Sequence, residues 1–247
     1  MLVFLNPETV AFTLVSAAAI GFLVPVVDAC IRYHEFLRFA WMSIRSWRDE
    51  VRVSVSYLYQ IKSDDKYLLI RSRRFNHFQP VGGVFKVFPA GKARLGEMGA
   101  RDDSLYPIDS IGIDDLRIRL KGKHLVRFFV WVQERRGRET DVWREFHEEL
   151  IASNLLPADV FRYVRAEYAG THDTGLRFSP FVQSKEVVFA EIYRLVPTPE
   201  QTAALSKLMG EDRPDLHWAT EIEIHRRGAG MNRGTVTPIS DHSWWIL

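Results

Sequence analysis

The chain has 247 residues, enough for one large domain or for a medium-sized domain with an appendage. Its 47% hydrophobic and 26% charged residues are ordinary for a folded protein and argue against disorder. The formal net charge of +2 gives no reason to expect a long nucleic acid or an acidic polymer as a partner. The only cysteine, Cys30, excludes an intrachain disulfide and a zinc site built from cysteines.

An uncharged, apolar segment lies near the start of the chain, at residues 10–27. As a helix it would reach about 27 Å, close to the ~30 Å hydrocarbon thickness of a bilayer. Small residues inside it, such as Gly21, suit close contact between helices in lipid. We therefore predict an N-terminal transmembrane helix. The alternatives are a buried soluble helix and a secretory signal, although a signal would need basic residues before the segment.

Arginines follow this segment, whereas no Lys or Arg precedes it. The positive-inside rule then places the N-terminus outside and the C-terminal part in the cytoplasm, as in a single-pass protein of the cell inner membrane. Residues 33–47 mix aromatic side chains with arginines and are expected to lie along the headgroup region, although a second membrane segment there is an alternative. Residues 1–49 are thus predicted to form a membrane anchor.

Beyond the anchor the pattern is that of a folded domain. Residues 51–60 alternate between apolar and polar side chains, which predicts a half-buried strand. A polar turn at residues 62–66 leads to a second strand at residues 67–72, so we expect a hairpin. A short strand is expected around residues 84–88. Residues 90–123 are rich in Gly and charged side chains and are expected to form loops with at most short strands.

The second half of the domain mixes strands with helices. The predicted strands, rich in β-branched and aromatic residues, are 125–133, 186–195 and 217–225. The predicted helices are 139–155, 157–168 and one that begins at Thr198-Pro199, where Thr suits the N-cap and Pro the first turn. Residues 244–247 form an apolar end. This order of elements predicts a mixed α+β sandwich in one domain, residues 50–247.

The predicted helix at residues 139–155 carries three glutamates spaced three and four residues apart, Glu145, Glu148 and Glu149. This spacing places their carboxylates on one face. Three like charges this close repel one another unless a cation lies between them. Mg²⁺ favours such an all-oxygen environment and is often bound together with phosphate. An ordinary acidic surface helix is the alternative interpretation.

The segment Arg144-Glu145-Phe146-His147-Glu148-Glu149 resembles the core of the Nudix box. In that family the glutamates hold divalent cations against a diphosphate, and the arginine helps to orient them. The resemblance implies that Glu145, Glu148 and Glu149 bind Mg²⁺ and that Arg144 orients them; in an active enzyme these four would be the catalytic set. A turn with Gly82-Gly83 also resembles the Pro-Gly-Gly-like turn at which the Nudix box begins.

The box departs from the standard pattern in three ways. Counted from Gly83, the arginine should fall near position 97, well before Arg144, so the chain carries an insertion. The glutamate in the middle of the box is unassigned, with Glu97 and Glu139 as candidates. Ile151 replaces the glycine expected after the Glu-Glu pair. These departures argue against hydrolysis but leave the expected fold unchanged.

The whole arrangement resembles the SMODS-associated NUDIX family. It combines an N-terminal membrane segment, the phrase from Arg73-Arg74-Phe75 to Gly82-Gly83-Val84-Phe85-Lys86, an insertion and then the box. The resemblance implies a Nudix-like α/β/α sandwich with a mixed sheet. It also implies a role in anti-phage defence beside bacterial cyclic-oligonucleotide synthases. There the Nudix-like domain senses the messenger, and the membrane part acts as an effector that oligomerises and disrupts the membrane.

A receptor for a cyclic oligonucleotide needs cations for phosphates and aromatic rings for base faces. The candidate ligand-binding residues are Arg71, Arg73, Arg74, Phe75, Phe78, Gly82, Gly83 and Lys86. Alternation along a strand would put Arg71 and Arg73 on the same side. A solvated basic strand edge is the alternative for this segment. For the whole protein the alternatives are an active Nudix hydrolase that cleaves a nucleoside diphosphate-type substrate with Mg²⁺, and a membrane-bound assembly scaffold.

Overall fold

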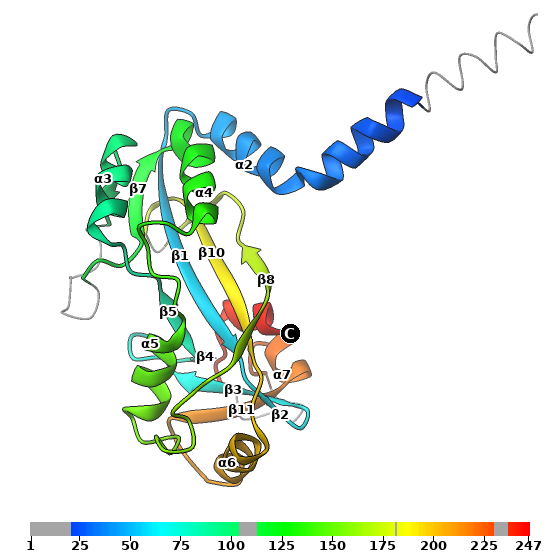
Figure 1. The fold of residues 1–247 in the computed structure, drawn as a ribbon, viewed down its shortest axis with the longest axis vertical. Coiled ribbons are helices and arrows are strands. Elements are labelled where there is room, and N and C mark those ends of the chain that lie inside the picture. Colours follow the sequence, from blue (N-terminus) through cyan, green and yellow to red (C-terminus); the bar gives the residue numbers. More distant parts are fainter. Residues whose placement is uncertain (1–20, 104–112, 181, 230–236) are drawn as a thin grey trace, which may run out of the picture.

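The computed structural model of the chain describes residues 21–103, 113–180, 182–229 and 237–247 (Figure 1). At its centre two long strands, β1 (Glu50–Gln60) and β10 (Ser184–Leu195), lie parallel, with Val53 opposite Val187. The other strands of this seven-stranded sheet pair antiparallel with β1, β7 or β10, so the sheet is mixed. They are β5 (Gly82–Val84), β6 (Arg101–Asp102), β7 (Arg117–Lys121), β8 (Ala166–Asp173) and β9 (Arg177–Ser179).

A second, four-stranded sheet lies at one end of the first (Figure 1). Its strands are β2 (Lys62–Ser63), β3 (Lys66–Arg71), β4 (Phe78–Pro80) and β11 (Leu216–Thr220). Both strands of the predicted hairpin therefore exist, but they do not pair with each other. β1 pairs with β10 on one side and with β5 and β7 on the other, so β3 pairs with β2, β4 and β11 instead. Residues 51–55 are buried on both faces of β1 and not on one as predicted, whereas burial alternates over residues 56–60 as expected for a half-buried strand.

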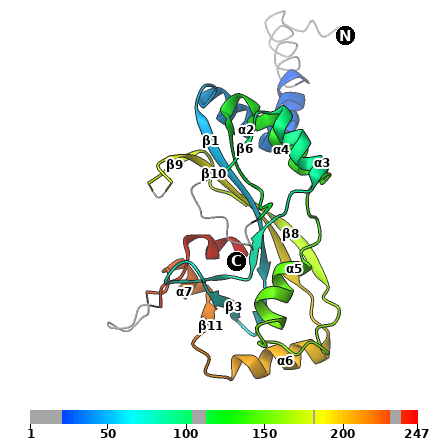
Figure 2. The same ribbon diagram turned by 90° about the vertical axis from the view of Figure 1, so that its left-hand side faces the viewer.

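The helices cover both faces of the sheets (Figure 2). They are α2 (His34–Arg45), α3 (Pro89–Glu97), α4 (Leu125–Glu134), α5 (Trp143–Phe146), α6 (Pro199–Met209) and α7 (Glu221–His225). Short helical turns add η1 (Gly122–His124), the π-helical η2 (His147–Ile151) and the 3₁₀-helical η3 (Asp241–Ile246). The fold is thus mixed α+β with a mixed sheet, as the sequence predicted.

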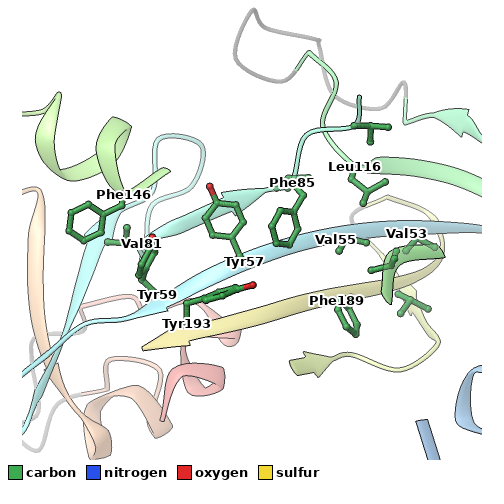
Figure 3. Close-up of a cluster of buried hydrophobic side chains, with 14 of the residues drawn as sticks. Val53, Val55, Tyr57, Tyr59, Val81, Phe85, Leu116, Phe146, Phe189 and Tyr193 are labelled. Carbon is green, nitrogen blue, oxygen red and sulfur yellow. The ribbon is translucent and has the colours of Figure 1, made fainter. Parts of the chain in front are cut away.

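Two hydrophobic cores lie on the two faces of β10. Phe189 belongs to the larger core, which also packs α2, α4 and α5, whereas Ile192 belongs to a smaller core together with Trp245 of η3. In the larger core Tyr59 of β1 meets Phe146 of α5 edge to face, with ring centroids 5.3 Å apart (Figure 3). This contact presses the start of the predicted Nudix helix against the central strand.

Residues 125–133 form the helix α4, where the sequence predicted a strand. Leu125, Phe128, Phe129 and Val132 are buried and recur at the three- and four-residue spacing of a helix. Their aromatic and β-branched composition favoured a strand, but packing against α2 overrides that preference. The ring of Phe39 on α2 stacks on that of Phe129, with centroids 3.4 Å apart.

Other predicted elements are confirmed or corrected. Helix α6 follows Thr198, whose side chain forms a capping box with Gln201, as its sequence indicated. Residues 90–123, predicted as loops, include most of α3, which has a proline in its first turn. Residues 157–168 do not form the predicted helix, and the chain there enters the edge strand β8. The predicted strand at 217–225 ends at Thr220, because a capping box with Glu223 starts α7.

The predicted Nudix helix at 139–155 is shorter and less regular than expected. It begins at Trp143, whose N–H donates to the Asp141 carboxylate over 2.9 Å. After Phe146 it changes from α to π geometry in η2. A π-helical turn contains more residues than an α-helical turn, so the side chains after residue 146 are rotated relative to the α-helical spacing.

The predicted membrane span is only partly within the described residues, because residues 10–20 lie outside them. Among the residues that are described, no helix is both long and apolar enough to cross a membrane. The helical segment from residue 21 extends away from the domain before α2 packs on α4 (Figure 1).

Candidate functional site

The Gly82-Gly83 pair lies directly beneath the glutamate helix. Gly82 has a φ of +149°, and a β-carbon there would lie too close to the Tyr57 carbonyl oxygen, so a side chain would overlap the backbone of β1. A β-carbon at Gly83 would overlap the Glu145 carboxylate. The two glycines thus let strand β5 fit between β1 and α5. Their role is to let these elements approach closely. Neither glycine is among the described residues that line the cavity beside this site.

Arg144 is the centre of the polar contacts at this site. Its Nε and Nη2 donate to the two carboxylate oxygens of Glu139, each over 3.0 Å. Nη2 also donates to the Val84 carbonyl over 2.9 Å, and Nη1 donates to Glu145 Oε1 over 2.5 Å. Burial alone would lower the pKa of Arg144, but the bond to Glu139 and the Glu145 charge raise it. The guanidinium is therefore a fixed cation that holds strand β5 and two carboxylates together.

Glu139 is the residue that the sequence left undecided. Besides its two bonds with Arg144, it accepts a hydrogen bond from the Lys86 N–H over 3.1 Å. The other candidate, Glu97, instead pairs with Arg94 and Arg127 on the surface. Sequence spacing could not separate the two, because the insertion hides the register of the box. Pairing with Arg144 assigns Glu139 to the site.

The three predicted metal-binding glutamates lie in different environments. The Glu149 side chain is partly buried, and one of its oxygens accepts a hydrogen bond from the Gly82 N–H over 2.9 Å. Burial, together with the Glu145 and Glu148 charges, raises the pKa of Glu149 to about 8. Burial also raises the pKa of Glu145. Glu148 is more exposed, with its carboxylate 3.8 Å from Arg144 Nη1.

This donor set fits a hard divalent cation in chemistry. The Glu145 and Glu148 charges raise the pKa of Glu149, because like charges this close disfavour its ionisation. Their present arrangement is one of ion pairs: within the described ranges, no group of three or more His, Cys, Asp or Glu side chains is arranged to hold a metal. The Arg144–Glu145 bond is one of these pairs, and the π-helical turn rotates Glu148 and Glu149 relative to the α-helical spacing.

A family model, described as the SMODS-associated NUDIX domain, matches residues 50–247. The chain belongs to this family. A search of curated proteins and a search of solved structures found no match. Nudix domains generally use a divalent metal such as Mg²⁺, which agrees with the carboxylate donor set beside Arg144.

A cavity of about 640 Å³ opens beside the box of this SMODS-associated NUDIX domain. Its lining residues are Arg73, Lys86, Val87, Phe88, Ile113, Asp114, Arg144, Glu148 and Ala152. Three cations from separate segments, Arg73, Lys86 and Arg144, thus face one space. Lys86 Nζ donates to the Asp115 carboxylate over 2.7 Å, and the Arg73 charge lowers the pKa of Glu149. Each of these two cations thus interacts with a nearby carboxylate.

The other predicted ligand residues lie elsewhere. Strand β3 ends at Arg71, so the expected alternation stops there and Arg73 belongs to the loop that follows. Arg71 donates to Asn76 over 3.0 Å and lines, with Phe78, a separate cavity of about 230 Å³. Phe75 lines a third cavity of about 500 Å³. The Arg74 N–H donates to Ser72 Oγ over 3.4 Å, and no described cavity has Arg74 in its lining.

Proposed function

We propose that this chain is a membrane-anchored receptor and effector of an anti-phage signalling system. Its Nudix-like α/β/α sandwich would bind a cyclic oligonucleotide messenger. The observation that carries the proposal is the cavity of about 640 Å³ that brings Arg73, Lys86 and Arg144 beside the Nudix glutamates. Three cations around one space fit the phosphates of a nucleotide, and the size lies within the ~300–1,000 Å³ of small-molecule sites.

Arg144 and the glutamates of the box would have different roles in binding. Arg144 fixes Glu139 and Glu145 by its hydrogen bonds and offers its charge to a phosphate in the cavity. Glu145, Glu148 and Glu149 would hold Mg²⁺, which would neutralise phosphate charge when bound. Glu149 carries a proton at neutral pH, because its pKa is about 8. Metal binding would therefore release this proton.

Hydrolysis of a nucleoside diphosphate-type substrate is the second candidate function. It is favoured by Glu149, since a pKa of about 8 lies near neutral pH, where a group is best suited to transfer protons as an acid or base. It is disfavoured by the π-helical turn at residues His147–Ile151, which rotates Glu148 and Glu149 relative to their arrangement in a regular α-helix. Receptor function needs only the cations and the cavity, and we therefore place it first.

The outer face of α2 supports the proposed membrane attachment. Phe39 and Met42 are buried against the domain, whereas the opposite side carries large exposed apolar residues. These are Tyr33, Phe36, Leu37, Trp41, Ile44 and Trp47. Tyr and Trp favour the boundary between headgroups and hydrocarbon, and the neighbouring arginines favour anionic lipid. We propose that residues 10–27 cross the inner membrane with the N-terminus outside, and that this face of α2 lies in the cytoplasmic boundary.

In this proposal, the messenger causes the domains to associate. The spans at residues 10–27 would then cluster through their small residues and disrupt the membrane. The test uses the full chain in dye-loaded vesicles that contain anionic lipid, with a panel of cyclic di- and trinucleotides and Mg²⁺. We expect one messenger to bind, to produce oligomers detectable by cross-linking, and to release the dye.

Two variants sharpen the test. Arg144→Ala should abolish binding and dye release. Arg165→Ala, which removes an exposed ion pair with Glu167, should change neither. Recovery of the intact messenger supports a receptor, whereas turnover would establish the hydrolase. A bound messenger that neither drives oligomerisation nor releases dye would contradict the effector proposal.

A further inference from the structure

A second large cavity, of about 500 Å³, shares a loop with the first. The loop between β3 and β4, residues 72–77, contributes Arg73 to the first cavity and Phe75 and His77 to the second. The second cavity is lined by Leu58, Phe75, His77, Gln79, Pro80, Ile239, Ser240, Asp241 and His242. Two cavities of ligand size thus meet at one short segment of chain.

The two cavities differ in charge. Arg73, Lys86 and Arg144 face the first together with two carboxylates, whereas the described lining of the second contains no lysine or arginine and one carboxylate, that of Asp241. Burial and nearby Arg177 lower the pKa of His242, so this ring adds no positive charge at neutral pH. A phosphate group therefore finds its partners in the first cavity only. The second suits an uncharged group.

The walls of the second cavity suit a flat, aromatic group. The rings of Phe75 and His77 have centroids 5.4 Å apart and planes at 13°, so they form an aromatic stack on the wall of the cavity. Leu58, Pro80 and Ile239 add apolar contacts. Stacking on such a surface is the usual way in which proteins bind the faces of unpaired bases.

Polar groups of the same cavity can contact the edge of such a ring. Gln79 is placed by the pairing of β4 with Ile70 of β3, and its amide offers both a donor and an acceptor. Ser240 adds a hydroxyl and Asp241 adds a carboxylate. Arg227 Nε lies 3.1 Å from this carboxylate and forms an ion pair with it. A stacking surface together with donors and acceptors at its edge matches the chemistry of a nucleobase.

We propose that the second cavity holds a base of the same nucleotide whose phosphate lies in the first cavity. This inference rests on the proposed function and adds a base-reading part to it. Arg73 and Phe75 are two residues apart, which corresponds to at most roughly 7 Å of chain. Phosphate and base are joined through one sugar, so neighbouring loop residues are suitably spaced to contact the two groups. Phe75 and His77 form the stacking surface, and Gln79 distinguishes the bases.

The test compares two probes on the full chain in detergent by calorimetry. The first is the member of a panel of cyclic di- and trinucleotides that binds, and the second is inorganic pyrophosphate, which has no base. Phe75→Leu keeps an apolar side chain but removes the ring. It should weaken cyclic nucleotide binding about tenfold, as expected for the loss of one stacked base, and leave pyrophosphate binding unchanged.

Further variants act as controls. Phe75→Tyr keeps the stacking and should retain affinity. Tyr163→Leu removes a ring that is 83% exposed and lines no described cavity, and it should have no effect. Gln79→Ala should reduce the difference in affinity between adenine- and guanine-containing probes. Phe75 is itself 42% exposed, so its replacement is expected to leave the fold intact.

The outcomes separate this inference from the proposed function. If Phe75→Leu and Gln79→Ala bind the cyclic nucleotide like the wild type, whereas Arg73→Ala weakens both probes, the base cavity is wrong and the receptor proposal stands. If the wild-type chain binds pyrophosphate but no nucleotide of the panel, or neither probe, the receptor proposal fails and the base cavity fails with it.

Discussion

Glu149 shows how one partly buried group links the site to stability. Its carboxylate is partly buried and accepts the Gly82 N–H, and loss of contact with water raises the pKa of this group from 4.5 to about 8. Between these two values the folded chain keeps a proton that the unfolded chain has lost. The free energy of unfolding therefore falls as the pH rises through this window, by about 1.4 kcal/mol per pH unit from this group alone.

We predict that, in EDTA, the wild-type melting temperature falls more steeply between pH 6 and pH 8 than that of Glu149→Gln. Glutamine keeps the shape and can still accept the Gly82 N–H, but it has no proton to lose. Thermal denaturation of both chains in matched buffers measures the difference. The surface variant Glu167→Gln should retain the wild-type slope. Parallel slopes for wild type and Glu149→Gln would contradict the partly buried, protonated state of Glu149.

Gly83 gives a second prediction at the residue scale. A methyl group there would overlap the Glu145 carboxylate, although the backbone of Gly83 does not require glycine by its φ value. We expect Gly83→Ala to displace Glu145 from Arg144, to lower the free energy of unfolding by about 1–3 kcal/mol, and to weaken ligand binding. Chemical denaturation and calorimetry measure the two effects.

Gly96→Ala is the matched control for this substitution. Gly96 lies in α3 with open space where its side chain would be, so alanine there should stabilise the helix by up to about 1 kcal/mol. Equal behaviour of the two alanine variants would show that the close approach of β5 and α5 is not required.

Helix α4 shows what the sequence could and could not predict at the element scale. Strands β1 and β10 and helix α6 were predicted because their signals are local: β-branched runs and an N-cap. Residues Leu125–Glu134 carry apolar side chains at both strand-like and helix-like spacing, and only the contact with α2 decides between them. The pairing of β1 with β10 was not predictable for a similar reason, since the partners lie far apart in the chain.

The residues of the candidate site also fall into those that the sequence could predict and those that it could not. The Arg144–Glu149 segment, the glycine pair, Arg73 and Lys86 were identified from motif and charge, and the structure brings them to one place. Glu139 was undecided because no local pattern marks it. Arg71 was grouped with Arg73 on the assumption of a continuing strand, which fails where β3 ends.

Phe129 tests the contact that makes α4 a helix. Phe129 is buried between Phe39 of α2 and the larger core. We predict that Phe129→Ala lowers the free energy of unfolding by about 3–5 kcal/mol and speeds trypsin cleavage after Arg38 and Arg45 of α2, because α2 loses its support. Val130→Ala on the outer side of α4, where the side chain is 41% exposed, should cost less than about 1 kcal/mol. Equal cleavage rates in both variants would contradict the role of this contact.

At the scale of the whole molecule, the apolar face of α2 determines how the domain would meet a bilayer. We predict that brominated lipids quench the tryptophan fluorescence of the full chain in vesicles, and that Trp41→Phe with Trp47→Phe removes most of this quenching. Trp244→Phe is the control, because Trp244 is similarly exposed but lies in η3. Quenching that persists in the double variant would place the bilayer elsewhere.

The parallel pairing of β1 with β10 also has a consequence for synthesis on the ribosome. Val53 leaves the ribosome long before its partner Val187, so the central ladder has a high contact order and forms late. Until then β1 is a long strand with an unpaired edge, which can pair with other unfolded copies. Nascent or truncated chains that end before β10 are therefore the forms of this protein most exposed to aggregation, and the most dependent on chaperones.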